Sequence, residues 1–96
     1  MKMGTEILDE VFTVIEDRRD NPKKGSYVSG LLEKGETKVI EKFEEESGEL
    51  SVAAKGDEKA NAIHEAADVV FHLMVLLAAK GVRIDEVMEE LRRRRR

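Results

Sequence analysis

The stretch from Ala66 to Ala79 constrains the fold of this 96-residue chain more than any other. Asp68 and His72 are its only polar side chains, and the apolar ones point in essentially every direction around a helix axis. A helix that is apolar on all sides must be buried on all sides. Four or five helices of one short chain can hardly surround such a helix, so we expect a second copy to cover the rest of it.

Glycines and the single proline divide the chain into helical segments, and no segment alternates polar and apolar residues as a strand does. We therefore predict one all-α domain over residues 1–96, an antiparallel bundle of four to five helices completed by dimerisation. The expected helices cover residues 5–19, a short turn through Leu31 and Leu32, and residues 37–55, 57–80 and 85–92, with Thr5 and Asp57 as N-caps. Residues 23–29 are expected to form a loop.

Apolar residues at helical spacing predict which faces of these helices are buried. On the first helix the predicted stripe is Ile7, Leu8, Val11, Val14 and Ile15. On the second long helix the predicted core residues are Val39, Ile40, Phe43, Leu50 and Ala54.

The charge distribution argues against nucleic acid as a partner. Five arginines occupy residues 92–96, and residues 1–91 carry 12 basic and 21 acidic side chains, a formal charge of −9. Broad nucleic-acid binding relies on a basic surface, which this body lacks. The arginines follow a predicted helix at the end where positive charge is favourable. We expect them to pair with the acidic body or to reach a substrate phosphate across a dimer.

The composition also bears on the compartment. Cysteine is absent, which excludes disulfides, thiolate metal sites and cysteine nucleophiles. No signal peptide is visible in the first ten residues. The apolar run is interrupted by Asp68 and His72, and it is shorter than the roughly 20 residues that cross a bilayer. We expect a soluble, cytoplasmic protein with no membrane partner.

Two acidic pairs are the candidate metal ligands, Glu46 with Glu49 and Glu65 with Asp68. Residues three apart share one face of a helix, so each pair presents two carboxylates side by side. If the two helices pack antiparallel, the four carboxylates converge and form a site for a hard cation, Mg²⁺ or alternatively Mn²⁺. Asp68 carries this argument, because a charge in an apolar helix needs a proton or a partner. For Glu46 and Glu49 alone, a solvated helix face is the competing interpretation.

The two histidines are interpreted differently. His72 follows Asp68 by one turn and extends the polar stripe, so we expect it beside the metal ligands or in contact with the substrate. Since Mg²⁺ prefers oxygen, the alternative is a hydrogen-bonded core histidine. His64 is expected to be exposed and without a function.

The order of these motifs resembles the phosphoribosyl-ATP pyrophosphohydrolase family of histidine biosynthesis, a branch of the all-α nucleoside triphosphate pyrophosphohydrolases. The resemblance runs from about residue 5 to residue 92. An E-x-x-E motif followed by E-x-x-D is typical of the superfamily. The narrower family is indicated by a Ser-Tyr pair, a Glu-Ala-Ala-Asp segment and an aromatic-His pair, which stand here at Ser26-Tyr27, Glu65–Asp68 and Phe71-His72.

The resemblance implies Mg²⁺-dependent hydrolysis of phosphoribosyl-ATP to phosphoribosyl-AMP and pyrophosphate. It implies that Glu46, Glu49, Glu65 and Asp68 hold the metal and that Glu45 orients or deprotonates the attacking water. General chemistry agrees, because a cation neutralises the triphosphate and a neighbouring carboxylate can accept the proton of the water.

The resemblance also places residues around the substrate. Lys42 and Lys38 are expected at the phosphates, and Ser26 and Tyr27 at the nucleotide or ribose. The alternatives are ion pairs within the helix for the lysines and a turn-forming role for Ser26 and Tyr27. Four positions depart from the family's usual residues, and they bear on the loop more than on the metal site: Val28, Gly30, Glu44 and Gly48.

Three other functions fit some of the same residues. A house-cleaning nucleoside triphosphate pyrophosphohydrolase keeps the metal site and prefers free nucleotides as substrates. A non-catalytic helical dimer, acting as an interaction module, binds no divalent metal. A di-iron bundle fits less well, because the Glu-x-x-His pairs of such bundles are missing.

Overall fold

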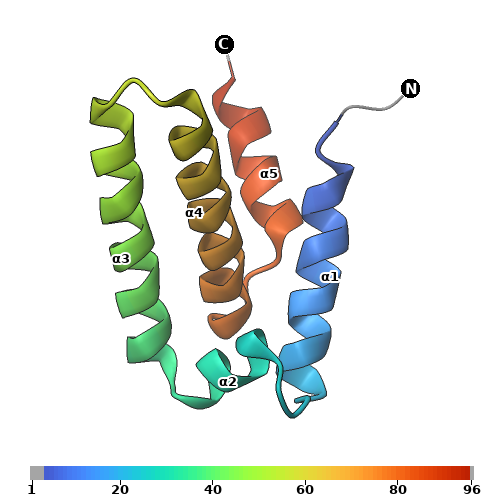
Figure 1. Cartoon of the computed structure of the whole chain (residues 1–96). Coiled ribbons are helices and arrows are strands. Elements are labelled where there is room, and N and C mark those ends of the chain that lie inside the picture. The colour runs from blue at the N-terminus through green and yellow to red at the C-terminus, as the bar shows by residue number, and fades with distance from the viewer. Residues whose placement is uncertain (1–3, 96) are drawn as a thin grey trace.

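The computed structural model describes residues 4–95, and these residues form five helices and no strand. The helices are α1 (Glu6–Asp20), α2 (Tyr27–Glu33), α3 (Glu36–Lys55), α4 (Lys59–Ala79) and α5 (Ile84–Arg94). Figure 1 shows α4 between α3 on one side and α1 with α5 on the other, while α2 crosses one end of the bundle. The prediction of an all-α fold is confirmed.

The two longest helices, α3 and α4, form an antiparallel hairpin (Figure 1). Gly56 ends α3, and its amide donates to the carbonyl oxygen of Ala53 at 3.1 Å. The N-cap of α4 is Glu58, so the prediction of Asp57 was wrong by one residue. Helices joined by so short a loop must lie side by side. The hairpin therefore sets the acidic residues of α3 against those of α4.

The beginning of α2 differs from the prediction. Tyr27 and Ser29, which were expected in a loop, are helical. Ser26 is the N-cap, and its hydroxyl oxygen accepts the Ser29 amide hydrogen at 3.1 Å, which satisfies a backbone donor that the helix leaves free. The buried Ser29 hydroxyl in turn donates to the Arg18 carbonyl oxygen at 2.9 Å. This contact fixes α2 against the end of α1.

The core draws side chains from all five helices, and its buried apolar members are Phe12, Ile15, Val28, Leu31, Val39, Met74, Val75, Ala78 and Ile84. The predicted stripe on α1 was right for Ile15 but wrong for Ile7 and Val14, which are 58% and 50% exposed. Phe12 is buried instead. On α3, Val39 is buried, whereas Ile40 and Ala54 are exposed.

Helix α4 is less enclosed than its sequence predicts. Four of its residues are buried within the chain, namely His72, Met74, Val75 and Ala78. The whole helix has 21 residues and is, by length and composition, long and apolar enough to cross a membrane, although the prediction was made for the shorter apolar run from Ala66 to Ala79. Within the chain it packs against α3 and α1. Between α1 and α4 lies an open hollow of 380 Å³, lined by Ile7, Leu8, Val11, Ala66, Ala67, Val70, Phe71 and Met74.

Gly48 is a test of how helix propensity contributes to this fold. It lies inside α3, and no neighbouring atom lies within 4 Å of the position that a Cβ would take. We expect Gly48→Ala to raise the free energy of unfolding by about 1 kcal/mol, because glycine is the poorer helix former. Urea unfolding followed by circular dichroism measures the change.

Gly81→Ala is the matched contrast. The same Cβ again meets no atom within 4 Å, but the φ angle of Gly81 is +72°, where an alanine is strained. Stability is therefore expected to fall in Gly81→Ala and to rise in Gly48→Ala. A change of the same sign in both variants would contradict this account of the two glycines.

Candidate metal and substrate site

Two of the four predicted ligands, Glu49 and Glu65, meet across the α3–α4 hairpin. Glu45 and Glu49 of α3 and Glu65 of α4 line one open hollow of 530 Å³. The charge of Glu46 is the main cause that raises the pKa of Glu49, followed by partial desolvation and the charge of Glu65. The two helices thus hold like charges within electrostatic reach of one another.

The potential ligand atoms fall into two groups. Among residues 4–95, sets of three such atoms within 4.8 Å of one another occur on α3, from Glu45, Glu46 and Glu49, and on α4, from His64, Glu65 and Asp68. The four predicted ligands are therefore divided between two groups, one on each arm of the hairpin. Each group contains one predicted pair and one additional residue.

Two carboxylate oxygens of this site are buried without a partner. They are Oε1 of Glu46 and Oε1 of Glu65, and no other buried side-chain nitrogen or oxygen in the described chain lacks a hydrogen bond. Glu46 is only 6% exposed, although it belongs to a run of acidic residues that suggests a solvated face. A buried carboxylate oxygen with no donor costs free energy. Carboxylates are the preferred ligands of hard cations, so these two oxygens fit Mg²⁺ or Mn²⁺.

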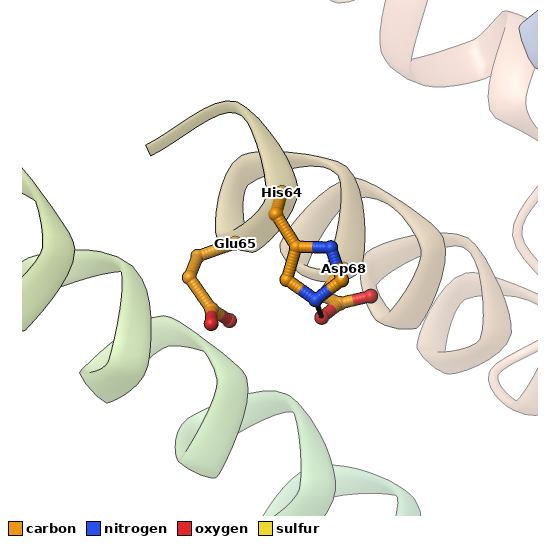
Figure 2. A group of neighbouring side chains, drawn as sticks. All are labelled: His64, Glu65 and Asp68. Atoms are coloured by element: carbon orange, nitrogen blue, oxygen red, sulfur yellow. Dashed lines mark ion pairs between the residues drawn. The ribbon is translucent and has the colours of Figure 1, made fainter. Parts of the chain in front are cut away.

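Asp68 and His64 lie together at the other group (Figure 2). His64 Nε2 is 3.4 Å from Asp68 Oδ2, and both side chains are partly or largely accessible to solvent. Figure 2 also shows Glu65 extending from α4 toward the neighbouring helix. His64 was expected to have no function, yet it brings an imidazole nitrogen to the acidic group. Its position four residues before Asp68 was the available signal, because such residues are neighbours on a helix.

The lysines are paired with acidic residues of their own helix. Lys42 Nζ lies 3.2 Å from Glu45 Oε2 and 3.3 Å from Glu46 Oε2. Hydrogen bonds to Glu45 and then Glu46 raise the pKa of Lys42. Lys38 Nζ lies 3.1 Å from Glu41 Oε1. These are the intrahelical pairs weighed above as the alternative to phosphate contact.

A second hollow adjoins the acidic site. Its volume is 240 Å³, and its lining includes Tyr27, Lys34, Lys38 and Lys42. Sequence reasoning missed Lys34, because this residue ends the short helix α2 and belongs to no recognisable motif. Two carboxylates, Glu41 and Glu45, also line this hollow, so the three lysines leave it with a net positive charge, which suits an anionic ligand.

Tyr27 and His72 connect α2 to α4. Tyr27 Oη lies 2.8 Å from His72 Nε2, and His72 Nδ1 lies 2.8 Å from the carbonyl oxygen of Asp68. His72 is 6% exposed, so the structure places it as a buried, hydrogen-bonded histidine next to the acidic group. Burial is the main cause that raises the pKa of Tyr27; the charge of Lys42 opposes it, and nearby carboxylates, Asp68 among them, add to it.

The repulsion between Glu46 and Glu49 can be measured in the metal-free protein. We expect Glu46→Gln to lower the pKa of Glu49 toward its usual value, because this substitution removes the main cause of the increase. Titration of the Glu49 carboxyl carbon by NMR, with a chelator present, measures the shift. Glu44→Gln is the control, because Glu44 lies outside both ligand groups and is expected to leave the pKa of Glu49 unchanged.

Glu46→Gln is also expected to change how the stability of the protein depends on pH, through the pKa of Glu49. The folded-state pKa of Glu49 lies above that of the unfolded chain, so this group favours folding at pH values below the unfolded-state pKa. That contribution is lost as the pH rises through the folded-state pKa. The loss is expected to be smaller in Glu46→Gln than in the unchanged protein. Equal pH dependence in both proteins would show that the two carboxylates do not interact.

Comparison with known proteins agrees with the motif pattern. A family model described as phosphoribosyl-ATP pyrophosphohydrolase matches residues 8–95. A protein of Methanocella arvoryzae named phosphoribosyl-ATP pyrophosphatase is 50% identical over 93 residues, which cover 95% of this chain and 98% of the relative. Proteins of the same name are 48% identical in Haloarcula marismortui, over 94% of both chains, and 46% identical in Methanococcoides burtonii, over 93% of this chain and 92% of the relative. The resemblance is confirmed, and the chain belongs to the phosphoribosyl-ATP pyrophosphohydrolase family.

Proposed function

We propose that this chain hydrolyses phosphoribosyl-ATP to phosphoribosyl-AMP and pyrophosphate, a step of histidine biosynthesis, with a divalent cation held between α3 and α4. Membership of the family and the names of its relatives support the substrate and the reaction. The observation that carries the metal site is the pair of buried, unpartnered oxygens on Glu46 and Glu65. Together with Glu49 and Asp68, these residues form the proposed ligand set for Mg²⁺ or Mn²⁺.

The residues around the ligand set have distinct roles in this proposal. A bound cation supplies positive charge to the triphosphate and to the departing pyrophosphate. Glu45 belongs to the α3 ligand group but is exposed, so its carboxylate can orient the attacking water and accept its proton. Lys42 is held beside Glu45 and Glu46, where its ammonium group can meet a phosphate oxygen. Lys38 and Lys34 extend the positive charge along the adjoining hollow.

Pyrophosphate release tests the reaction. With Mg²⁺ present, the unchanged protein is expected to release pyrophosphate from phosphoribosyl-ATP faster than from free nucleoside triphosphates. We expect Glu45→Gln to lower kcat by roughly 10²- to 10⁴-fold with little change in KM, the loss typical of a general base. Glu44→Gln is the matched control on α3 and is expected to retain activity.

Metal binding and substrate preference together distinguish the competing functions. Mn²⁺ titrated by calorimetry is expected to bind the unchanged protein and to bind poorly to Glu46→Gln and Asp68→Asn. A preference for free triphosphates would favour a house-cleaning enzyme instead. Absence of metal binding and of any hydrolysis would favour a non-catalytic interaction module.

We further propose that the protein is a cytoplasmic homodimer that binds neither a membrane nor nucleic acid. The hollow between α1 and α4 is lined only by apolar side chains, and Ile7 and Val70 at this hollow are 58% and 39% exposed. An apolar face of this kind on a small soluble domain is typical of an interface. A second copy presents the same face, which makes a two-fold symmetric contact the simplest way to cover it.

Sedimentation velocity tests the dimer. Ile7→Glu places a charge on the exposed apolar face, and we expect it to convert the dimer to a monomer that keeps its helical circular dichroism spectrum. Ile40→Glu makes the same change on α3, away from the hollow, and is expected to leave the dimer intact. Sedimentation of the unchanged protein as a monomer would refute the proposal.

A further inference from the structure

Which residue donates in the hydrogen bond between Tyr27 and His72 follows from the other hydrogen bond of the His72 ring, from Nδ1 to the carbonyl oxygen of Asp68. A carbonyl oxygen can only accept a hydrogen bond, so His72 Nδ1, which is 2.8 Å from the carbonyl oxygen of Asp68, must carry the hydrogen. A neutral imidazole has one N–H group. Its Nε2 atom is therefore an acceptor, and the Tyr27 hydroxyl, 2.8 Å away, is the donor.

This direction determines what Tyr27 can offer to a ligand. A phenol hydroxyl has one hydrogen, and in Tyr27 that hydrogen is committed to His72. The remaining capacity of Tyr27 Oη is that of an acceptor. A phosphate oxygen is also an acceptor, so Tyr27 in this state cannot donate to the phosphates of a nucleotide. It can accept a hydrogen bond from a ligand hydroxyl.

The position of Tyr27 brings this acceptor to the edge of the metal site. Tyr27 is 52% exposed and lines the hollow that also contains Lys34, Lys38 and Lys42. The charges of both Glu46 and Asp68 act on its hydroxyl, so it lies within reach of both arms of the hairpin. The lysine ammonium groups can donate to phosphate oxygens, and Tyr27 Oη offers a separate, uncharged acceptor beside them.

The ring of His72 is held firmly enough to fix this contact. His72 is buried, both its nitrogens are hydrogen-bonded, and Tyr27 and Phe71 pack edge-on against the ring, with centroid distances of 5.7 and 5.3 Å. The imidazole therefore has little freedom to rotate and exchange its donor and acceptor atoms.

From these contacts we infer that His72 is a positioning residue that holds Tyr27 as a hydrogen-bond acceptor for a ribose hydroxyl of the substrate. The ribose is the group joined directly to the α-phosphate, at which cleavage occurs, so it is the part of a nucleotide that lies beside a metal site for this reaction. The inference rests on the proposed function and adds to it a residue pair that recognises the sugar.

The direction of the hydrogen bond can be tested without substrate. The chain has two histidines, so a ¹H–¹⁵N spectrum of the imidazole rings contains two ring systems, and a His64→Gln variant assigns them. At about pH 8, where an ordinary imidazole is neutral, we expect the hydrogen of His72 on Nδ1. Tyr27→Phe is expected to change the Nε2 resonance and to leave that hydrogen in place. A hydrogen on Nε2 would overturn the inference.

Recognition of the sugar can be tested with substrates that lack the 2′- or the 3′-hydroxyl. The unchanged protein is expected to show a KM roughly five- to tenfold higher for at least one of these analogues, the ratio typical of one neutral hydrogen bond, with kcat little changed. In Tyr27→Phe the KM for the ribose substrate is expected to rise by the same factor, and the analogue to bind no worse than the ribose substrate. Thr13→Val, which removes a hydroxyl from the exposed part of α1, is the control.

His72 variants test whether this residue acts through Tyr27. His72→Gln keeps an acceptor oxygen and is expected to retain most of the discrimination, whereas His72→Leu is expected to lose it. Tyr27→Phe combined with His72→Leu should discriminate no less than Tyr27→Phe alone, because the two residues act as a unit. If His72→Leu fails to fold, His72→Gln and the imidazole spectrum still decide the question.

The possible outcomes separate the two proposals. Failure of the unchanged protein to hydrolyse the ribose substrate would refute the proposed function, and this inference with it. Normal hydrolysis with equal KM for the ribose and deoxyribose substrates would overturn the inference about Tyr27 and His72 alone. So would full discrimination in His72→Leu.

Discussion

The packing of α3 against α4 is the constraint on which the site depends, because it forces carboxylates into the contact between two helices. Glu46 is nearly enclosed, and one of its oxygens has no donor. Glu65 contributes a second such oxygen from the opposite helix. Apolar residues of similar size would make this contact more favourable in the metal-free chain. Side chains that oppose stability at one place in an otherwise consistent core are typical of a functional site.

The charges at this contact are only partly balanced within the chain. Lys42 interacts with Glu45 and Glu46 on its own helix, and His64 lies beside Asp68. Glu49 has neither contact, and the neighbouring carboxylates keep its pKa raised. The uncompensated negative charge is thus concentrated where the two helices face each other. Electrostatic attraction of a divalent cation is the direct physical result.

The sequence predicted the parts of this structure that depend on local pattern. Helix positions, the hairpin and the acidic pairs follow from spacing and from glycine positions. The expectation that Asp68 is buried was wrong within one chain, because its side chain is 38% exposed. The predictions failed where tertiary packing determines which side chains are buried. Ile7 and Val14 belong to a regular stripe, but α1 contacts the bundle mainly through Phe12 and Ile15, so the stripe is only half buried within one chain.

The site itself was predictable in composition but not in detail. Glu46 looked like part of a solvated face, but tertiary packing leaves it only 6% exposed. Ser26 looked like a loop residue and is the cap that starts α2. Lys34 had no signal, because its place in the hollow comes from the fold alone. The Tyr27–His72 bond joins residues 45 positions apart, a distance over which no periodicity operates.

The hairpin has a consequence for how such an enzyme can change. All candidate ligands and the candidate base lie between residues 45 and 68, in one continuous segment of two helices and their loop. The residues proposed to meet the rest of a nucleotide are Tyr27, the first residue of α2, and Lys34, its C-cap, and α2 packs across the end of that segment. In the proposed function, cleavage and recognition of the nucleotide are therefore carried by separate modules. Replacement or lengthening of α2 can redirect such a scaffold to new nucleotides and leave its reactive centre intact.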